Sequence, residues 1–112
     1  MIINITNSPK QDKRFRVYMS DGRHFDFGLD TGSTYIDHGD KKKRRAYILR
    51  HLGNSREREL IESLTPSPSL FSMELLWGKH TDLNSNINEL NRHFSKLRGG
   101  LISKPLTYKN IY

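Results

Sequence analysis

The chain has 112 residues, of which 34% are hydrophobic and 28% charged, and its 19 Lys and Arg against 12 Asp and Glu give a formal net charge of +7. This length predicts one domain with a modest core and leaves little room for a second core. The absence of cysteine excludes disulfides, thiolate metal sites and thiol nucleophiles, and it suits a reducing compartment. We expect no membrane span, because no stretch of the sequence approaches ~18 apolar residues.

The first predicted element is an antiparallel hairpin, in which apolar and polar residues alternate over 13–19 and 23–27. A three-residue loop, Ser20-Asp21-Gly22 with Gly22 in the left-handed conformation, pairs Val17 with Phe25. A two-residue loop would instead place Tyr18 opposite Phe25. We prefer the longer loop because it gathers the apolar side chains on one face, namely Phe15, Val17, Met19, Phe25 and Phe27, and the polar ones on the other, namely Arg14, Arg16, Tyr18, His24 and Asp26. Residues 2–6 supply a third strand, which a two-stranded hairpin needs for stability, and 35–36 form another short strand.

From residue 40 onward the apolar period becomes helical. Asp40 caps a basic amphipathic helix over 41–52, and Ser55 caps a second, short helix. The third helix covers 69–77, with Ser67 as N-cap and Pro68 at its first position, and its apolar residues surround the axis, which predicts burial.

The last helix covers 83–97 and is capped by Thr81 or Asp82. Its apolar face is formed by Leu83, Ile87, Leu90, Phe94 and Leu97, and the asparagines 84, 86, 88 and 91 are expected outside.

The fold class is therefore α+β, with a short antiparallel β-hairpin sheet packed by three or four helices. Residues 1–98 form a single basic domain. Residues 99–112 contain a proline and lack a helical period, so we interpret them as an extended C-terminal arm that docks on a neighbouring molecule. The arm residues expected to contact a partner are Leu101, Ile102, Leu106, Tyr108, Ile111 and Tyr112.

Asp30-Thr31-Gly32-Ser33 reads like the active-site turn of dimeric aspartic proteases, in which each chain contributes one carboxylate to a dyad. Such a site also needs a glycine-rich flap hairpin downstream, whereas a lysine-rich helix follows here. A turn that uses aspartate and glycine for backbone reasons is the favoured interpretation. The five histidines lack metal-ligand spacing, and the nucleophile elbow and phosphate-binding glycine loops are absent. We therefore expect a protein that is not an enzyme, with no catalytic residues, no metal and no cofactor.

The largest charge feature is the basic run that opens the helix over 41–52. It is either a solvated helix face or a surface that contacts phosphates or an acidic partner. The candidate binding residues are Lys41, Lys42, Lys43, Arg44, Arg45 and Arg50. Sequence-specific readout is disfavoured, because no zinc finger, RNA-recognition signature or helix-turn-helix is present.

An ordered set of residues resembles a small domain of unknown function encoded by large nucleocytoplasmic DNA viruses, the giant viruses. The set is Ser20-Asp21-Gly22, Phe27-Gly28, Gly32, Tyr35, His38, Asp40, Arg45, Tyr47, Arg50-His51, Arg58-Glu59 and Leu75-Leu76-Trp77-Gly78, and the match extends over about residues 13–95. Two features depart from the pattern: the tryptophan expected after Arg58-Glu59 is missing, and Pro66-Ser67-Pro68 replaces a glycine-aromatic stretch. The resemblance implies an origin and a setting, and it carries over no catalytic residue.

In that setting, the leading expectation is a minor capsid or capsid-associated structural protein that bridges or cements neighbouring virion proteins through its arm. It would be found in the virion, and in the host cytoplasm during assembly. Its partners would be other virion or capsid proteins and DNA, in an oligomeric assembly. The alternative is a sequence-nonspecific nucleic-acid-binding accessory protein, and the third hypothesis is a dimeric aspartic protease that uses Asp30.

Overall fold

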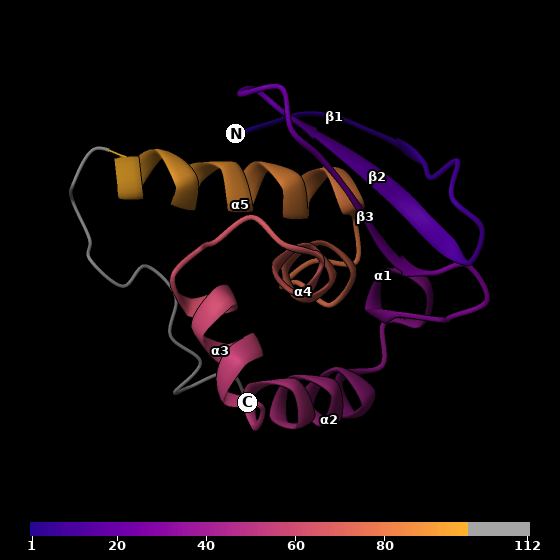
Figure 1. Ribbon diagram of the computed structural model, residues 1–112. Helices are drawn as coiled ribbons and strands as arrows, with labels where there is room; N and C mark the ends of the chain where they lie inside the picture. The colour runs from indigo at the N-terminus through magenta and orange to yellow at the C-terminus, as the bar shows by residue number, and fades with distance from the viewer. Residues whose placement is uncertain (99–112) are drawn as a thin grey trace.

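The computed structural model describes residues 1–98, which form an α+β fold (Figure 1). The strands are β1 (Ile2–Asn7), β2 (Lys13–Met19) and β3 (His24–Leu29). The helical elements are α1 (Tyr35–His38), α2 (Lys41–Leu52), α3 (Ser55–Glu62), α4 (Pro68–Phe71), the π-helical segment η1 (Ser72–Leu76) and α5 (Leu83–Arg98). The expected α+β class is confirmed, although the described residues contain more helices than three or four. The predicted arm, residues 99–112, lies outside the described residues.

The sheet has the predicted antiparallel register. Its strand order is β1-β2-β3, and β1 is the expected third strand. Val17 pairs with Phe25, and Gly22 has a φ of 92° and donates its N–H to the carbonyl of Met19 at 3.0 Å, as a three-residue loop requires. Val17 and Phe27 are fully buried, so the apolar face of the hairpin faces the core.

The prediction of a strand at 35–36 was wrong, because these residues begin the one-turn helix α1. Thr34 and Asp37 form a capping box there, in which the Asp37 carboxylate accepts the Thr34 backbone N–H at 2.8 Å. Arg14 holds the same carboxylate through two hydrogen bonds of 2.6 and 2.7 Å. This local network outweighs the β propensity of the tyrosine-isoleucine pair.

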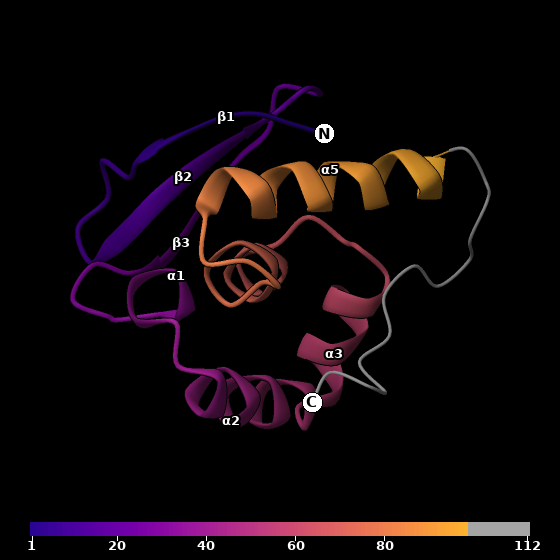
Figure 2. The same cartoon turned by 180° about the vertical axis from the view of Figure 1, so that it is seen from behind.

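The α4–η1 segment is the centre of the core, as its apolar circumference predicts. Figures 1 and 2 show it between the sheet, α5 and the α2–α3 pair. Its buried apolar side chains are no more than 1% exposed and are Leu70, Phe71, Met73, Leu75 and Leu76. Ser67 caps α4 with Pro68 at its first position, as predicted. The widening to a π-helical turn was not anticipated, and the Trp77 N–H donates to the Ser72 carbonyl at 3.2 Å.

One helix cap and two asparagines of α5 differ from the predictions. Asn54, not Ser55, caps α3, because its side chain accepts the first free N–H groups of that helix at 3.1 Å. Asn86 and Asn91 were expected outside, which is wrong: Asn86 is 2% exposed, and Asn91 bonds both backbone groups of Ile2. Both amides tie α5 to the rest of the fold. None of the helices within residues 1–98 has the length and apolarity that crossing a bilayer demands.

Candidate nucleic-acid interface and adjoining pocket

Helix α2 begins at Asp40, whose side chain accepts the backbone N–H groups of Lys42 and Lys43 at 2.9 and 3.2 Å. These hydrogen bonds lower the pKa of the Asp40 carboxyl, the Lys43 bond having the largest effect. Three consecutive lysines occupy the first turn, where the helix dipole disfavours cations. Because lysines at this end do not stabilise a helix, helix stability does not explain why three of them occupy the first turn.

Four of the five exposed cations of α2 form two rows along its exposed face. At about 100° per residue, Lys43 and Arg50 lie on one flank of the exposed face, and Lys41 and Arg45 on the other. Between the rows lie Lys42, Ala46 and Leu49, all exposed, with Leu49 at 51%. The helix carries no acidic residue, KKKRRAYILRHL. This face, defined as the α2 cationic face, is therefore positive along its whole length.

Arg44 differs from the other five predicted binding residues. Its Nε donates to the carbonyls of Trp77 and Gly78 at 3.0 Å each, and its guanidinium lies 5.5 Å from the centre of the Tyr35 ring. Arg44 is only partly exposed. The structure thus places five of the six predicted cations on the surface and uses Arg44 to join α2 to the chain after η1.

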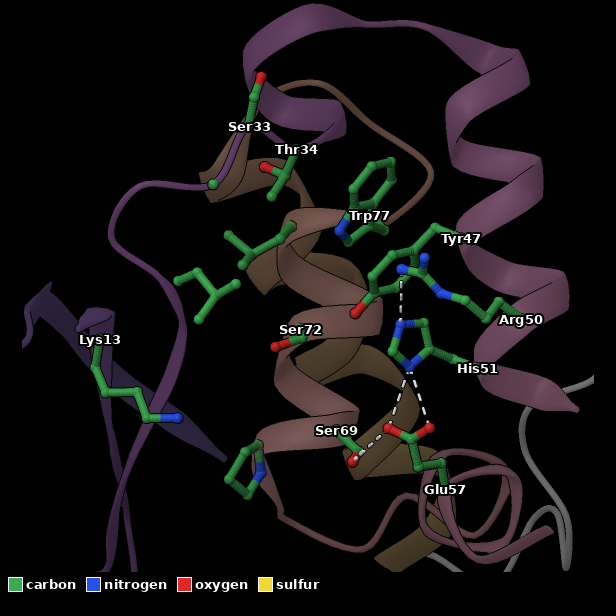
Figure 3. Close-up of a pocket in the computed structure, with 15 residues that line it drawn as sticks. Lys13, Ser33, Thr34, Tyr47, Arg50, His51, Glu57, Ser69, Ser72 and Trp77 are labelled. Atoms are coloured by element: carbon green, nitrogen blue, oxygen red, sulfur yellow. Dashed lines mark hydrogen bonds and ion pairs between the residues drawn. The ribbon is translucent and has the colours of Figure 1, made fainter. Parts of the chain in front are cut away.

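A pocket of about 460 Å³ lies beside α2, bounded by the β3–α1 loop, α3 and the α4–η1 segment (Figure 3). Its aromatic wall is a stack of three rings. Tyr47 lies parallel to Trp77 at 4.3 Å between ring centres, and His51 covers the opposite side of Tyr47 at 4.1 Å. Because both faces of Tyr47 are occupied, a ligand would meet the edges of these rings rather than insert between them.

A series of hydrogen-bonded side chains runs along the same wall. The Arg50 Nη2 lies 3.4 Å from the Nε2 of His51, and the Nδ1 of His51 lies 3.1 Å from a Glu57 carboxylate oxygen. Ser69 donates its hydroxyl to Glu57 at 3.3 Å. The two ring nitrogens of His51 thus face different partners, Nε2 the Arg50 guanidinium and Nδ1 the Glu57 carboxylate. These hydrogen bonds fix Glu57, and the Arg50 guanidinium also lies 5.9 Å from the centre of the Tyr47 ring.

Tyr47 remains protonated in this setting. Burial raises the pKa of its phenol to about 12, and the nearby Glu57 carboxylate acts in the same direction.

Lys13 reaches the pocket from the sheet, on the side opposite to Arg50 (Figure 3). The pocket therefore combines an apolar and aromatic wall with a cation on either side and hydroxyl groups between them.

Sequence reasoning assigned no binding role to Tyr47, His51, Glu57 or Lys13, and it favoured a buried position for the helix that contains Trp77. The spacing of Tyr47 and His51, four residues apart on one helix, was an available signal that the two rings share a face. Their contacts with α3 and η1 depend on the tertiary fold, which the sequence pattern does not reveal.

Three other predictions concerned the turn at 30–33, metal binding and the C-terminal arm. The turn at 30–33 is exposed and lies between β3 and α1, so the helices α1 and α2 occupy the stretch where an aspartic protease needs its flap hairpin. Among the described residues, no group of histidines and carboxylates is arranged to hold a metal ion. The six arm residues from Leu101 to Tyr112 lie outside the described residues, and their contact role stays a prediction.

Residues 3–51 match a family of unknown function (DUF5754). The match includes the sheet, α1 and nearly all of α2, and it ends before α3 and Trp77. It covers less than half of the chain. No curated protein and no solved structure matches the chain.

Proposed function

We propose that the protein binds nucleic acid without sequence preference through the α2 cationic face. The observation that supports this proposal is the arrangement of five exposed cations, four of them in two rows and Lys42 between the rows, on a helix that carries no acidic residue. Neutralising phosphates with lysine and arginine releases counterions, and this release provides most of the free energy of nonspecific binding.

The shape of the face suits a nucleic-acid groove. An α-helix of this length is about 18 Å long and about 10 Å wide, so it fits the major groove of duplex DNA, where phosphates border both sides. Lys41 and Arg45 would meet one backbone, and Lys43 and Arg50 the other. Ala46, between the rows, permits a close approach. No side chain of this set forms an evident base-reading pair, which is why no sequence preference is proposed.

The experiment measures the affinity for a random 20-base-pair duplex by fluorescence anisotropy. The K41Q/K42Q/K43Q variant removes three charges from the face. Its control, K79Q/R92Q/K96Q, removes three charges from exposed residues elsewhere. The proposal requires the first variant to lose at least about tenfold in affinity and the control to retain most of its binding. Equal losses in the two variants would mean that only the net charge matters, and would contradict a defined interface.

A second proposal is a minor capsid or capsid-associated role, with the protein bridging neighbouring virion proteins of a large DNA virus. It is supported by the two outer strands of the sheet, each of which exposes a large apolar side chain: Ile3 is 67% exposed and Leu29 is 65% exposed. Strand edges with exposed apolar residues accept strands of other chains.

This second proposal is tested by deleting residues 99–112 and, separately, by the variant I3K/L29K. Each protein is first checked for folding by circular dichroism and then mixed with purified capsid proteins of the source virus in a co-sedimentation assay. Folded variants that no longer co-sediment would support bridging. Unchanged co-sedimentation of both variants would contradict it.

A further inference from the structure

We infer that the pocket beside α2 receives one unpaired nucleotide of a bound single strand. This inference rests on the proposed nucleic-acid binding and adds a preference for single-stranded regions or frayed ends. The pocket volume of about 460 Å³ lies within the range of small-molecule sites, which are mainly apolar with a few placed polar groups. A nucleotide has this composition, because a flat apolar base is joined to an anionic phosphate.

The base side of the pocket is apolar. Leu29, Leu76 and Pro68 line it together with Trp77, and Ser72 lies at the same cavity. Leu76 is 1% exposed and belongs to the core, whereas Leu29 is 65% exposed at the rim. Hydroxyl groups both donate and accept, so they can serve the edge of any base. This part of the pocket therefore fits a base without specifying which one.

Two cations, one on each side of the pocket, can meet the phosphates of the strand that enter and leave it. Arg50 lies at the pocket and also in the Lys43 row of the α2 cationic face, so a backbone that follows this row arrives at the pocket mouth. Lys13 lies on the other side (Figure 3). The Glu57 carboxylate is held by His51 and Ser69 at 3.1 and 3.3 Å and keeps its negative charge, so the phosphate has to lie at Arg50 or at Lys13, away from Glu57.

The proposal predicts that the protein binds single-stranded DNA and duplex DNA with different affinities. In a duplex each base is paired and stacked, and extracting one costs a few kcal/mol. A single strand offers its bases without that cost, so it can use the α2 cationic face and the pocket together. The affinity for single-stranded DNA should therefore exceed the affinity for duplex DNA.

The test uses the fluorescence of Trp77, which is the chain's one tryptophan and lines the pocket. The full chain is titrated with a ten-residue oligothymidylate, with the matching duplex and with free thymidine monophosphate. We expect the oligothymidylate to change the emission and to bind about tenfold more tightly than the duplex, with the free nucleotide much weaker. A free nucleotide that binds as tightly as the oligonucleotide would instead assign the pocket to mononucleotides and overturn the proposal.

Variants separate the pocket from the α2 cationic face. Lys13→Gln should weaken single-strand binding about tenfold, as the loss of a charge-assisted contact does, and leave duplex binding unchanged. Leu29→Ser, which removes apolar surface from the exposed rim of the pocket, should have the same selective effect, and Lys79→Gln, the control, should have none. If single strand and duplex bind equally and the Trp77 emission does not change, the pocket proposal fails while the α2 proposal stands. If neither binds, both fail.

Discussion

Replacing Arg44 separates the two roles that a basic residue of α2 can have. The variant Arg44→Met keeps an unbranched stem but removes the Nε donor that the carbonyls of Trp77 and Gly78 share at 3.0 Å. The matched variant is Arg45→Met, which removes the same charge from the next residue, on the exposed face. We expect the first substitution to destabilise the fold and the second to affect mainly nucleic-acid binding.

The magnitude follows from the contacts. A hydrogen bond to a charged donor contributes about 1.5–3 kcal/mol, and a cation over an aromatic ring at a partly exposed site adds about 0.5–1 kcal/mol. Arg44 makes both kinds of contact, the second with Tyr35 at 5.5 Å. Because water can solvate part of this site after the change, we expect a loss of about 2–3 kcal/mol, which lowers the Tm by roughly 10 °C or more in a domain of this size. Arg45 is exposed, and even an ion pair at such a site contributes at most about 1 kcal/mol, so Arg45→Met should cost less than Arg44→Met.

The assay is thermal and urea unfolding followed by circular dichroism, combined with duplex affinity measured well below the Tm of both variants. We expect Arg44→Met to have the lower Tm and Arg45→Met to lose more affinity for duplex DNA. Equal stability of the two variants, with weaker binding by Arg44→Met, would show that Arg44 contacts phosphate and would refute the structural role derived from its carbonyl contacts.

Three further changes probe the core and the sheet. Asn86→Asp keeps the side-chain shape but replaces the amide that donates to two carbonyls at 2.8 and 3.0 Å, so urea unfolding should show a loss of about 3 kcal/mol. Gly78→Ala would place a Cβ 2.2 Å from the Glu74 carbonyl oxygen, and it should cost about 3 kcal/mol or more in the same measurement. Arg16 holds the pKa of the 5%-exposed Asp26 carboxyl at about 2. An unfolded aspartate titrates near pH 3.9, so this stabilisation, roughly 2–3 kcal/mol, is complete above about pH 5 and is lost as the pH falls toward 2. In the Asp26→Asn variant the free energy of unfolding should fall less steeply as the pH is lowered through that range. An unchanged fall would contradict the ion pair between Arg16 and Asp26.

The hairpin shows what the sequence pattern can predict. Alternating side chains and the position of Gly22 determine its register locally, so the pairing of Val17 with Phe25 followed from the sequence alone. The helix caps at Asp40 and Ser67 were equally local signals. By the same logic, the Thr34 and Asp37 capping box was visible as a Thr-x-x-Asp pattern and would have prevented the error at 35–36.

Other features depend on contacts between distant parts of the chain. Arg44 looks like its basic neighbours until the fold brings it to Trp77, and Asn86 looks like a solvent-facing residue until its amide reaches the turn before α5. The pocket has the same origin, because α2, α3 and η1 contribute its wall separately. The sequence thus predicted the cationic face of α2 but neither the structural role of Arg44 nor the pocket beside Arg50.

The most direct test of the central claim is the salt dependence of duplex binding by the full chain and by K41Q/K42Q/K43Q. The five exposed cations of the α2 cationic face should neutralise three to four phosphates, so log K should fall with log salt with a slope of about −3 to −4. The triple variant should reduce the magnitude of that slope by about 2 or more. No binding at ~50 mM salt, or an identical slope in the variant, would contradict a nucleic-acid interface on α2.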